Sequence, residues 1–283
     1  MGTPQRFAAP RLSPDGRRLA LSAQGDIWIY EMDRDVLTRL TFDGYSDVPV
    51  WSPDGRRIVY GSRVGGLTND NLFVRDADGS GNAVRLLESD LPQQPTSWSS
   101  DGKTLVYEQD DPDTGSDIWL LDLQDGGEPR AFLRTPFDER HARLSPDDRW
   151  LSYTSNESGR YEVYVRPLSG AGGREQVSTE GGVHPVWSRD GRELFYRSDG
   201  RMMVVEVTTE PSIRFSKPRR MFVMESTAVN PVDSMADYDV SADGERFVVL
   251  RTEPRDPLEF QPRFVLNWFE ELKAKVPTEA KSR

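Results

Sequence analysis

The sequence predicts an all-β fold, a six-bladed β-propeller built from four-stranded antiparallel blades. A short motif of the form Ser-x-Asp-Gly, or a close variant of it, occurs six times in the chain. The copies lie about forty to fifty residues apart, and each is followed by short runs rich in β-branched and aromatic residues. Repeats of this length that supply a few short strands each are typical of propellers, in which one small sheet forms one blade.

The motif predicts a tight corner between the first and second strands of each unit. Pro presets the backbone at the second turn position, Asp bonds its own neighbouring backbone, and Gly accepts a positive φ. An apolar residue precedes each serine and an apolar run follows each turn. We therefore interpret the repeated aspartates as turn formers rather than catalysts. The motif serines are Ser13, Ser52, Ser99, Ser145, Ser188 and Ser241.

A third and a fourth strand complete each expected blade. Runs such as Asp26–Tyr30 and Asp117–Leu121 have the composition of third strands, and Thr38–Thr41 that of a fourth strand. The six blades are expected at approximately residues 8–41, 47–87, 94–134, 140–178, 183–223 and 237–270.

The chain is expected to form one domain over residues 1–275, with a short C-terminal helical tail over residues 271–283. The last blade should contain Tyr238–Ser241, Arg246–Leu250 and Arg263–Trp268. Its outer strand is either missing or supplied by residues near Thr3–Phe7, so the closing edge should be a weak seam. This favours a fragment of a longer protein.

The composition of the chain limits the classes of partner that it can bind. The net charge is −11 and the sequence pI is about 4.9, which argues against nucleic acid or an anionic membrane because phosphate binding requires a basic surface. No apolar run approaches the roughly twenty residues of a membrane span, and the N-terminus has no signal-peptide pattern. The absence of cysteine excludes disulfides. We expect a monomer that binds a protein or peptide.

The pattern P-x-W-S-x-D-G, followed by an apolar strand and a D-I-W-type strand, resembles the repeats of TolB-like propellers from about Pro10 to Trp268. Phe264–Leu272 also resembles the closing segment of propellers appended to some bacterial Ser/Thr protein kinases. The resemblance implies a protein-interaction module in a periplasmic or extracytoplasmic location, and related propellers accompany hydrolase domains. The chain departs from the pattern at Asp148, where the other copies have Gly, and it contains no kinase or hydrolase domain.

Binding is expected where the repeats differ. In a four-stranded blade, the loops between the second and third strands and those between blades emerge on one face, around the mouth of the central channel. We call it the loop-bearing face, and variable loops on a rigid scaffold commonly carry binding sites. Candidate binding residues in these loops are Arg63, Asp138 and Arg140.

The two histidines of the chain are in register with each other. His141 and His184 each lie four residues before a motif serine, and Asp237 has the same position in the next repeat. Two imidazoles and a carboxylate are a transition-metal ligand set. The alternative is that these residues are polar side chains bordering channel water.

These observations favour a non-catalytic binding module without a cofactor, because the sequence has no nucleophile elbow, cysteine nucleophile or phosphate-binding glycine loop. One alternative is a metal-dependent hydrolase or sugar-processing lyase with its site at the channel mouth. Another is the extracytoplasmic sensor domain of a membrane kinase.

Overall fold

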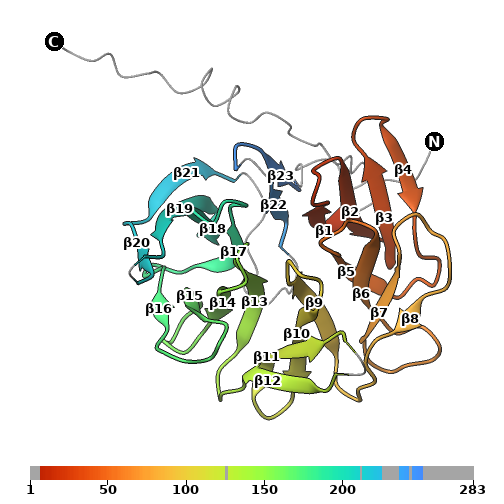
Figure 1. Ribbon diagram of the computed structural model, residues 1–283, viewed down its shortest axis with the longest axis horizontal. Helices are drawn as coiled ribbons and strands as arrows, with labels where there is room; N and C mark the ends of the chain where they lie inside the picture. The colour runs from red at the N-terminus through yellow and green to blue at the C-terminus, as the bar shows by residue number, and fades with distance from the viewer. Residues whose placement is uncertain (1–6, 125–126, 211, 225–235, 242–243, 251–283) are drawn as a thin grey trace, which may run out of the picture.

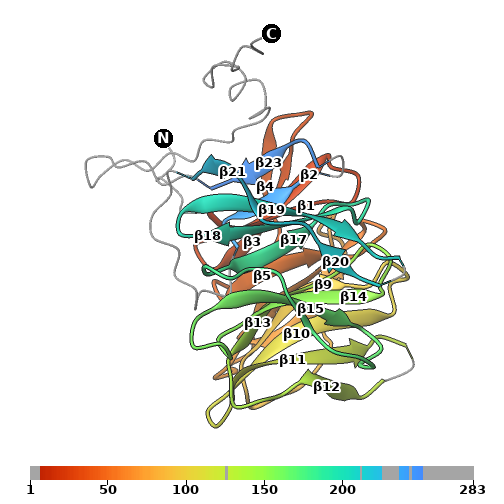
Figure 2. The same cartoon turned by 90° about the vertical axis from the view of Figure 1, so that its left-hand side faces the viewer.

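A computed structural model describes residues 7–124, 127–210, 212–224, 236–241 and 244–250. Every regular element in this part of the chain is a β-strand. The strands form six antiparallel sheets arranged around a central axis (Figure 1), and neighbouring sheets pack face to face (Figure 2). The described residues contain no helix long and apolar enough to cross a membrane.

Five of the sheets are complete blades. Blade 1 consists of β1 (Phe7–Leu12), β2 (Arg18–Ala23), β3 (Asp26–Glu31) and β4 (Val36–Arg39). Blade 2 consists of β5 (Ser46–Trp51), β6 (Arg57–Ser62), β7 (Asn71–Asp76) and β8 (Val84–Arg85). Blade 3 consists of β9 (Gln93–Trp98), β10 (Thr104–Asp111), β11 (Gly115–Asp122) and β12 (Pro129–Leu133). Blade 4 consists of β13 (Glu139–Leu144), β14 (Trp150–Ser155), β15 (Glu162–Pro167) and β16 (Glu175–Gln176).

Blade 5 differs from the others in having five strands. It consists of β17 (Val183–Trp187), β18 (Glu193–Ser198), β19 (Arg201–Thr208), β20 (Arg214–Phe215) and β21 (Arg219–Val223). Because β19 is eight residues long, its two ends pair with different strands: Val207 and Thr208 with β20, and Arg201 to Val204 with β21.

The prediction of six four-stranded blades is wrong for the described residues, which form five blades and a two-stranded sheet of β22 (Tyr238–Val240) and β23 (Phe247–Val249). The sixth repeat therefore supplies only its first two strands here. The expected third strand, Arg263–Trp268, the kinase-like segment Phe264–Leu272, the helical tail 271–283 and the outer-strand candidate near Thr3 lie outside the described residues.

The two-stranded sheet nevertheless occupies the position between blades 5 and 1. Its inner strand β22 contacts both β17 and β1. The backbone N–H of Leu12 donates to Oδ2 of Asp239 at 2.7 Å, and Val248 packs with Leu19 and Leu21. Six inner strands, β1, β5, β9, β13, β17 and β22, thus surround the channel.

The repeated motif forms a hydrogen-bonded corner in each blade. In blade 2, the hydroxyl of Ser52 donates to Oδ1 of Asp54 at 2.5 Å and accepts from the N–H of Arg57 at 2.8 Å. The hydrogen bond from Ser52 lowers the pKa of Asp54. The same serine contacts recur in blades 1, 3, 4 and 5. The motif aspartates are therefore turn formers on what we call the turn-bearing face, opposite the loop-bearing face.

Apolar side chains fill the space between neighbouring sheets. Ile27 of blade 1 packs with Ile58 and Tyr60 of blade 2, all essentially inaccessible to solvent. Burial of one such aliphatic side chain contributes about 1.5–3 kcal/mol. The indole N–H of Trp51 also donates to the backbone carbonyl of Arg11 in the preceding blade at 2.9 Å. Trp51 thus helps to join blade 2 to blade 1.

Candidate functional site

The inner strands share a backbone irregularity near the loop-bearing face. The pairing of first and second strands shifts register around Ala9, Val48, His141 and His184, which all have φ between 48° and 59°. This left-handed conformation is uncommon for residues other than glycine. The position lies four residues before each motif serine, so both histidines occupy a bulge that the scaffold repeats.

The side chains around these bulges change character from one side of the ring to the other. Small or apolar residues occupy the equivalent positions in blades 1 and 2. The following three blades and the two-stranded sheet instead place polar groups there, on or next to first and second strands. These groups, which we call the polar belt, are the buried Glu108, His141, Thr154, His184 and Arg197, together with the partly exposed Asp237 just before β22.

The structure brings the two histidines together. Their ring centroids lie 3.9 Å apart at an interplanar angle of 63°, and the side chains are 6% and 3% exposed. Nδ1 of His141 lies 3.1 Å from Oγ1 of Thr154, and the hydroxyl of Tyr238 donates to the backbone carbonyl of His184 at 2.5 Å. Neighbouring repeats thus place two imidazoles in direct contact.

Asp237 forms an ion pair with Arg197 from the neighbouring blade. The Arg197 side chain is only 2% exposed, so the charge of Asp237 neutralises a buried guanidinium. Within the described parts of the chain, no group of three or more His, Asp or Glu side chains has the geometry to hold a metal ion. The predicted ligand set of His141, His184 and Asp237 therefore contributes the imidazole pair and a carboxylate that is bound to arginine.

Glu108 is a carboxyl group of the polar belt that sequence reasoning did not single out. One of its carboxylate oxygens accepts from the backbone N–H of His141 at 2.5 Å, and Oε2 has no hydrogen-bond partner among the described residues. Burial raises the pKa of Glu108 to about 7, against the opposing effect of the nearby Arg140 guanidinium. A carboxyl group next to the histidine pair is thus close to its titration midpoint at neutral pH. Its register, nine residues after Ser99 and equivalent to Arg197 after Ser188, is visible in the sequence.

Asp138 and Arg140 hold the loops of blades 3 and 4 together. Oδ1 of Asp138 accepts from the backbone N–H of Ser116 at 2.9 Å and from Nε of Arg140 at 3.0 Å, and the hydroxyl of Tyr161 donates to Oδ2. Burial alone would raise the pKa of Asp138, but the hydrogen bonds from Tyr161 and Arg140 outweigh it and lower the pKa. These two predicted binding residues therefore hold the loops next to the polar belt in place.

Arg63 belongs to a different sector of the face. It lies in the loop between β6 and β7 of blade 2, where Nε is 3.2 Å from Oδ1 of Asp70 and the guanidinium lies 5.9 Å from the Tyr45 ring centroid. The histidines belong to blades 4 and 5, on the other side of the ring (Figure 1).

A pocket of about 620 Å³ opens beside the polar belt, between the loops of blades 4 and 5. Arg197 is buried at its channel side, Arg160 is largely exposed at its rim, and Tyr161 is half-buried. Four glycines (Gly159, Gly181, Gly182 and Gly200) also line it. We call it the loop pocket. Sequence reasoning did not single out Tyr161 or Arg197.

Comparison with known proteins agrees with this architecture. No protein-family model matches the sequence. The Tol-Pal system protein TolB of Wolinella succinogenes is 26% identical over 203 residues, covering 72% of this chain and 46% of that protein. The chain spans about half the length of the curated relatives it matches.

Two solved structures show the same fold. A putative TolB from Agrobacterium tumefaciens superposes with a TM-score of 0.64 at 20% identity, over 75% of this chain and 81% of that one. An oligogalacturonate lyase in complex with manganese superposes with a TM-score of 0.61 at 16% identity, over 89% and 72% of the two chains. The protein therefore has a TolB-like β-propeller fold, an architecture that occurs both with and without enzyme activity.

Proposed function

We propose that this protein is a non-catalytic, monomeric propeller that binds a protein or peptide through the loop pocket and the adjoining channel mouth. The observation that carries the proposal is the composition of the pocket. Arginine and tyrosine are the residue types that most often dominate binding energy at protein interfaces. Here Arg160, Tyr161 and Arg197 surround one opening on the face where the repeats differ.

The pocket also suits an extended peptide. Glycine lacks a side chain, so a partner can approach the backbone closely at Gly159, Gly181 and Gly200. An added Cβ would meet no atom within 4 Å at Gly159, and the nearest atoms at Gly181 and Gly200 would be 4.0 and 3.9 Å away. Backbone hydrogen bonds could then provide affinity, while the arginines and Tyr161 provide selectivity.

Selection of peptides from a random display library on the immobilised protein tests the proposal. Selected peptides should bind in solution, and cross-linking should place them on the loops at residues 156–161 and 181–183. Peptides that bind only elsewhere, or a library that yields no binder, would contradict it.

A location outside the cytoplasm is part of the same proposal, and its support is the similarity to TolB. The relatives named above include no kinase, so a role as the sensor domain of a membrane kinase has no support from them.

A metal-dependent enzyme is the second candidate function. The contact between His141 and His184 favours it, together with the fold shared with a manganese-bound lyase. The described residues do not complete a three-ligand group, so we derive no catalytic step. Elemental mass spectrometry of the wild type beside His184→Ala distinguishes the candidates. About one equivalent of metal in the wild type, lost in the variant, would favour the enzyme. Equal metal content in both proteins would exclude a site at the histidine pair.

A further inference from the structure

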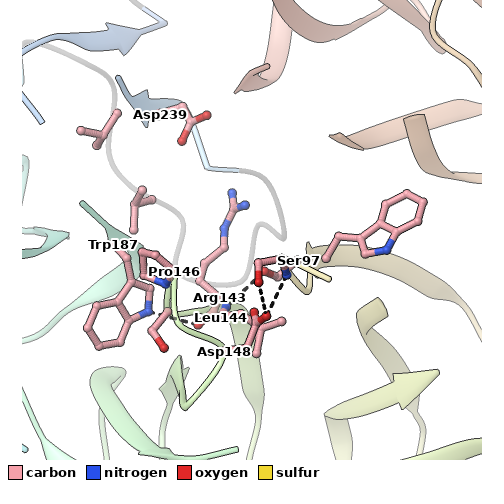
Figure 3. Close-up of a pocket in the computed structure, with 12 residues that line it drawn as sticks. Ser97, Arg143, Leu144, Pro146, Asp148, Trp187 and Asp239 are labelled. Atoms are coloured by element: carbon pink, nitrogen blue, oxygen red, sulfur yellow. Dashed lines mark hydrogen bonds between the residues drawn. The ribbon is translucent and has the colours of Figure 1, made fainter. Parts of the chain in front are cut away.

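A second pocket, of about 240 Å³, lies at the other end of the channel, on the turn-bearing face. It is lined by residues of blades 3, 4 and 5 and of β22, including Ser97, Arg143, Trp187 and Asp239 (Figure 3). Arg143 and Asp239 come from first strands, two residues before a motif serine, whereas Asp148 lies in the turn after Ser145. We call it the turn pocket.

Two arginines from opposite sides of the ring share this level of the channel. Arg11 of β1 and Arg143 of β13 hold the same repeat position in blades 1 and 4, so two sheets lie between them in either direction around the ring. Arg11 is 6% exposed. Burial, and then the charge of Arg143, lowers the pKa of Arg11 to about 9, which leaves it protonated at neutral pH. The two guanidinium groups are thus close enough to repel each other, and Arg143 is the one that lines the turn pocket.

The protein supplies few acceptors for these guanidinium groups. NH1 of Arg11 donates to the carbonyl of Pro10 at 3.0 Å, but Nε of Arg11 and NH2 of Arg143 are buried without hydrogen-bond partners among the described residues. Asp239 is the nearby carboxylate, and one of its oxygens is already bound to the N–H of Leu12 at 2.7 Å. Buried charged donors usually have acceptors, so an acceptor from outside the chain would satisfy them.

The backbones of both arginines are fixed by the next blade. Trp51 Nε1 donates to the carbonyl of Arg11 at 2.9 Å, and Trp187 Nε1 donates to that of Arg143 at 3.2 Å. The Arg143 side chain extends from its strand into the space below Asp239 (Figure 3). The hydroxyl of Ser97 accepts from Leu144 N at 3.1 Å and keeps its own hydrogen for donation. The donors are therefore positioned before a ligand arrives.

We propose that the turn pocket binds a carboxylate, with Arg143 as its principal donor, Arg11 as the facing charge and Ser97 as a neutral donor. Arginine presents paired N–H groups that match a carboxylate. The two carboxylates that line the pocket each have a partner within the protein already: Asp148 accepts from the N–H and hydroxyl of Ser100, and Asp239 accepts from the N–H of Leu12. The site lies at the opposite end of the channel from the loop pocket and does not rest on the proposed function there.

Tryptophan fluorescence provides the test because Trp98 and Trp187 line the pocket. The probes are sodium acetate, matched in ionic strength with sodium chloride, and a short peptide with acetylated and amidated ends that contains one Glu, matched with its Gln counterpart. A carboxylate site gives a saturable change with acetate or the Glu peptide and none with chloride or the Gln peptide. A response to the peptide alone identifies a peptide segment as the source of the carboxylate, and similar responses to both probes identify a free acid.

Arg143→Gln should weaken carboxylate binding about tenfold or more, because a charge-assisted hydrogen bond is lost. Arg143→Lys keeps the positive charge but lacks the paired N–H groups of arginine, so it should bind the carboxylate with intermediate affinity. The control Arg130→Gln, which changes an exposed arginine of β12 outside the pocket, should bind like the wild type. No saturable response of the wild type to either carboxylate overturns the proposal, as does an unchanged affinity in a folded Arg143→Gln protein.

Discussion

The backbone N–H of Leu12 in the first strand donates to Oδ2 of Asp239 in β22, at 2.7 Å. This hydrogen bond joins the beginning of the described chain to its last sheet, over a sequence separation of 227 residues. The ring is therefore closed by side-chain chemistry at a seam where the outer strands present in blades 1 to 5 have no counterpart among the described residues.

Asp239→Ala should lower the free energy of unfolding by about 1.5–3 kcal/mol, because it removes a charge-assisted hydrogen bond and the carboxylate beside Arg11. Asp239→Asn keeps an acceptor for the N–H of Leu12 and should lower the free energy of unfolding by less. Urea denaturation measures both, with the exposed Asp33→Ala as the control, expected within about 0.5 kcal/mol of the wild type. A loss no larger than that of the control would show that the seam does not depend on this contact.

The Ser-x-Asp-Gly corner leads to a similar prediction about stability within a complete blade. Ser52→Ala removes the contacts with Asp54 and with the N–H of Arg57 from a side chain that is 1% exposed. The cost should be about 1–3 kcal/mol, since the N–H is left without its acceptor. Thermal unfolding of Ser52→Ala beside the exposed Ser80→Ala gives the comparison. Equal midpoints for the two variants would refute a stabilising role for the serine.

The raised pKa of Glu108 predicts a pH dependence of stability. The folded protein retains this proton up to about pH 7, whereas an ordinary glutamate loses it near 4.5. The folded state thus binds more protons between these values, and the contribution of Glu108 to stability falls as the pH rises through that window. Glu139, whose pKa burial also raises to about 7, contributes in the same direction.

Glu108→Gln should therefore gain stability relative to the wild type on going from about pH 5 to about pH 8, by on the order of 1–3 kcal/mol. Gln keeps an acceptor for the N–H of His141. Denaturant titrations at the two pH values measure the change, and the exposed Glu175→Gln is the control. If the difference in free energy of unfolding between Glu108→Gln and the wild type did not vary with pH, the raised pKa of Glu108 would be contradicted.

The sequence predicted the architecture well where the repeat is strict. The serine register located the inner strands, and the shared offset of His141 and His184 from their serines placed them in adjacent blades, where the structure finds their rings in contact. The prediction was wrong about the number of complete blades. A turn motif marks the start of a unit, and Ser241 does not determine how many strands follow it.

The site could be predicted less well because its partners come from different strands. The equivalence of Glu108 and Arg197 becomes informative only once each is seen beside the inner strand of the next blade. Likewise, the spacing that selected Asp237 as a ligand could not show that it pairs with Arg197. Pockets such as the one at Tyr161 arise from loops whose lengths vary between repeats.

The most direct test of the account is the affinity of a selected peptide for four proteins, measured by calorimetry. The proteins are the wild type, Arg160→Ala, Tyr161→Ala and the control Arg130→Ala, which removes an exposed arginine from β12 in blade 3. We predict that the two pocket variants bind about tenfold or more weakly and that the control binds like the wild type. Equal affinities in all four proteins, with the fold retained, would show that the loop pocket is not the binding site.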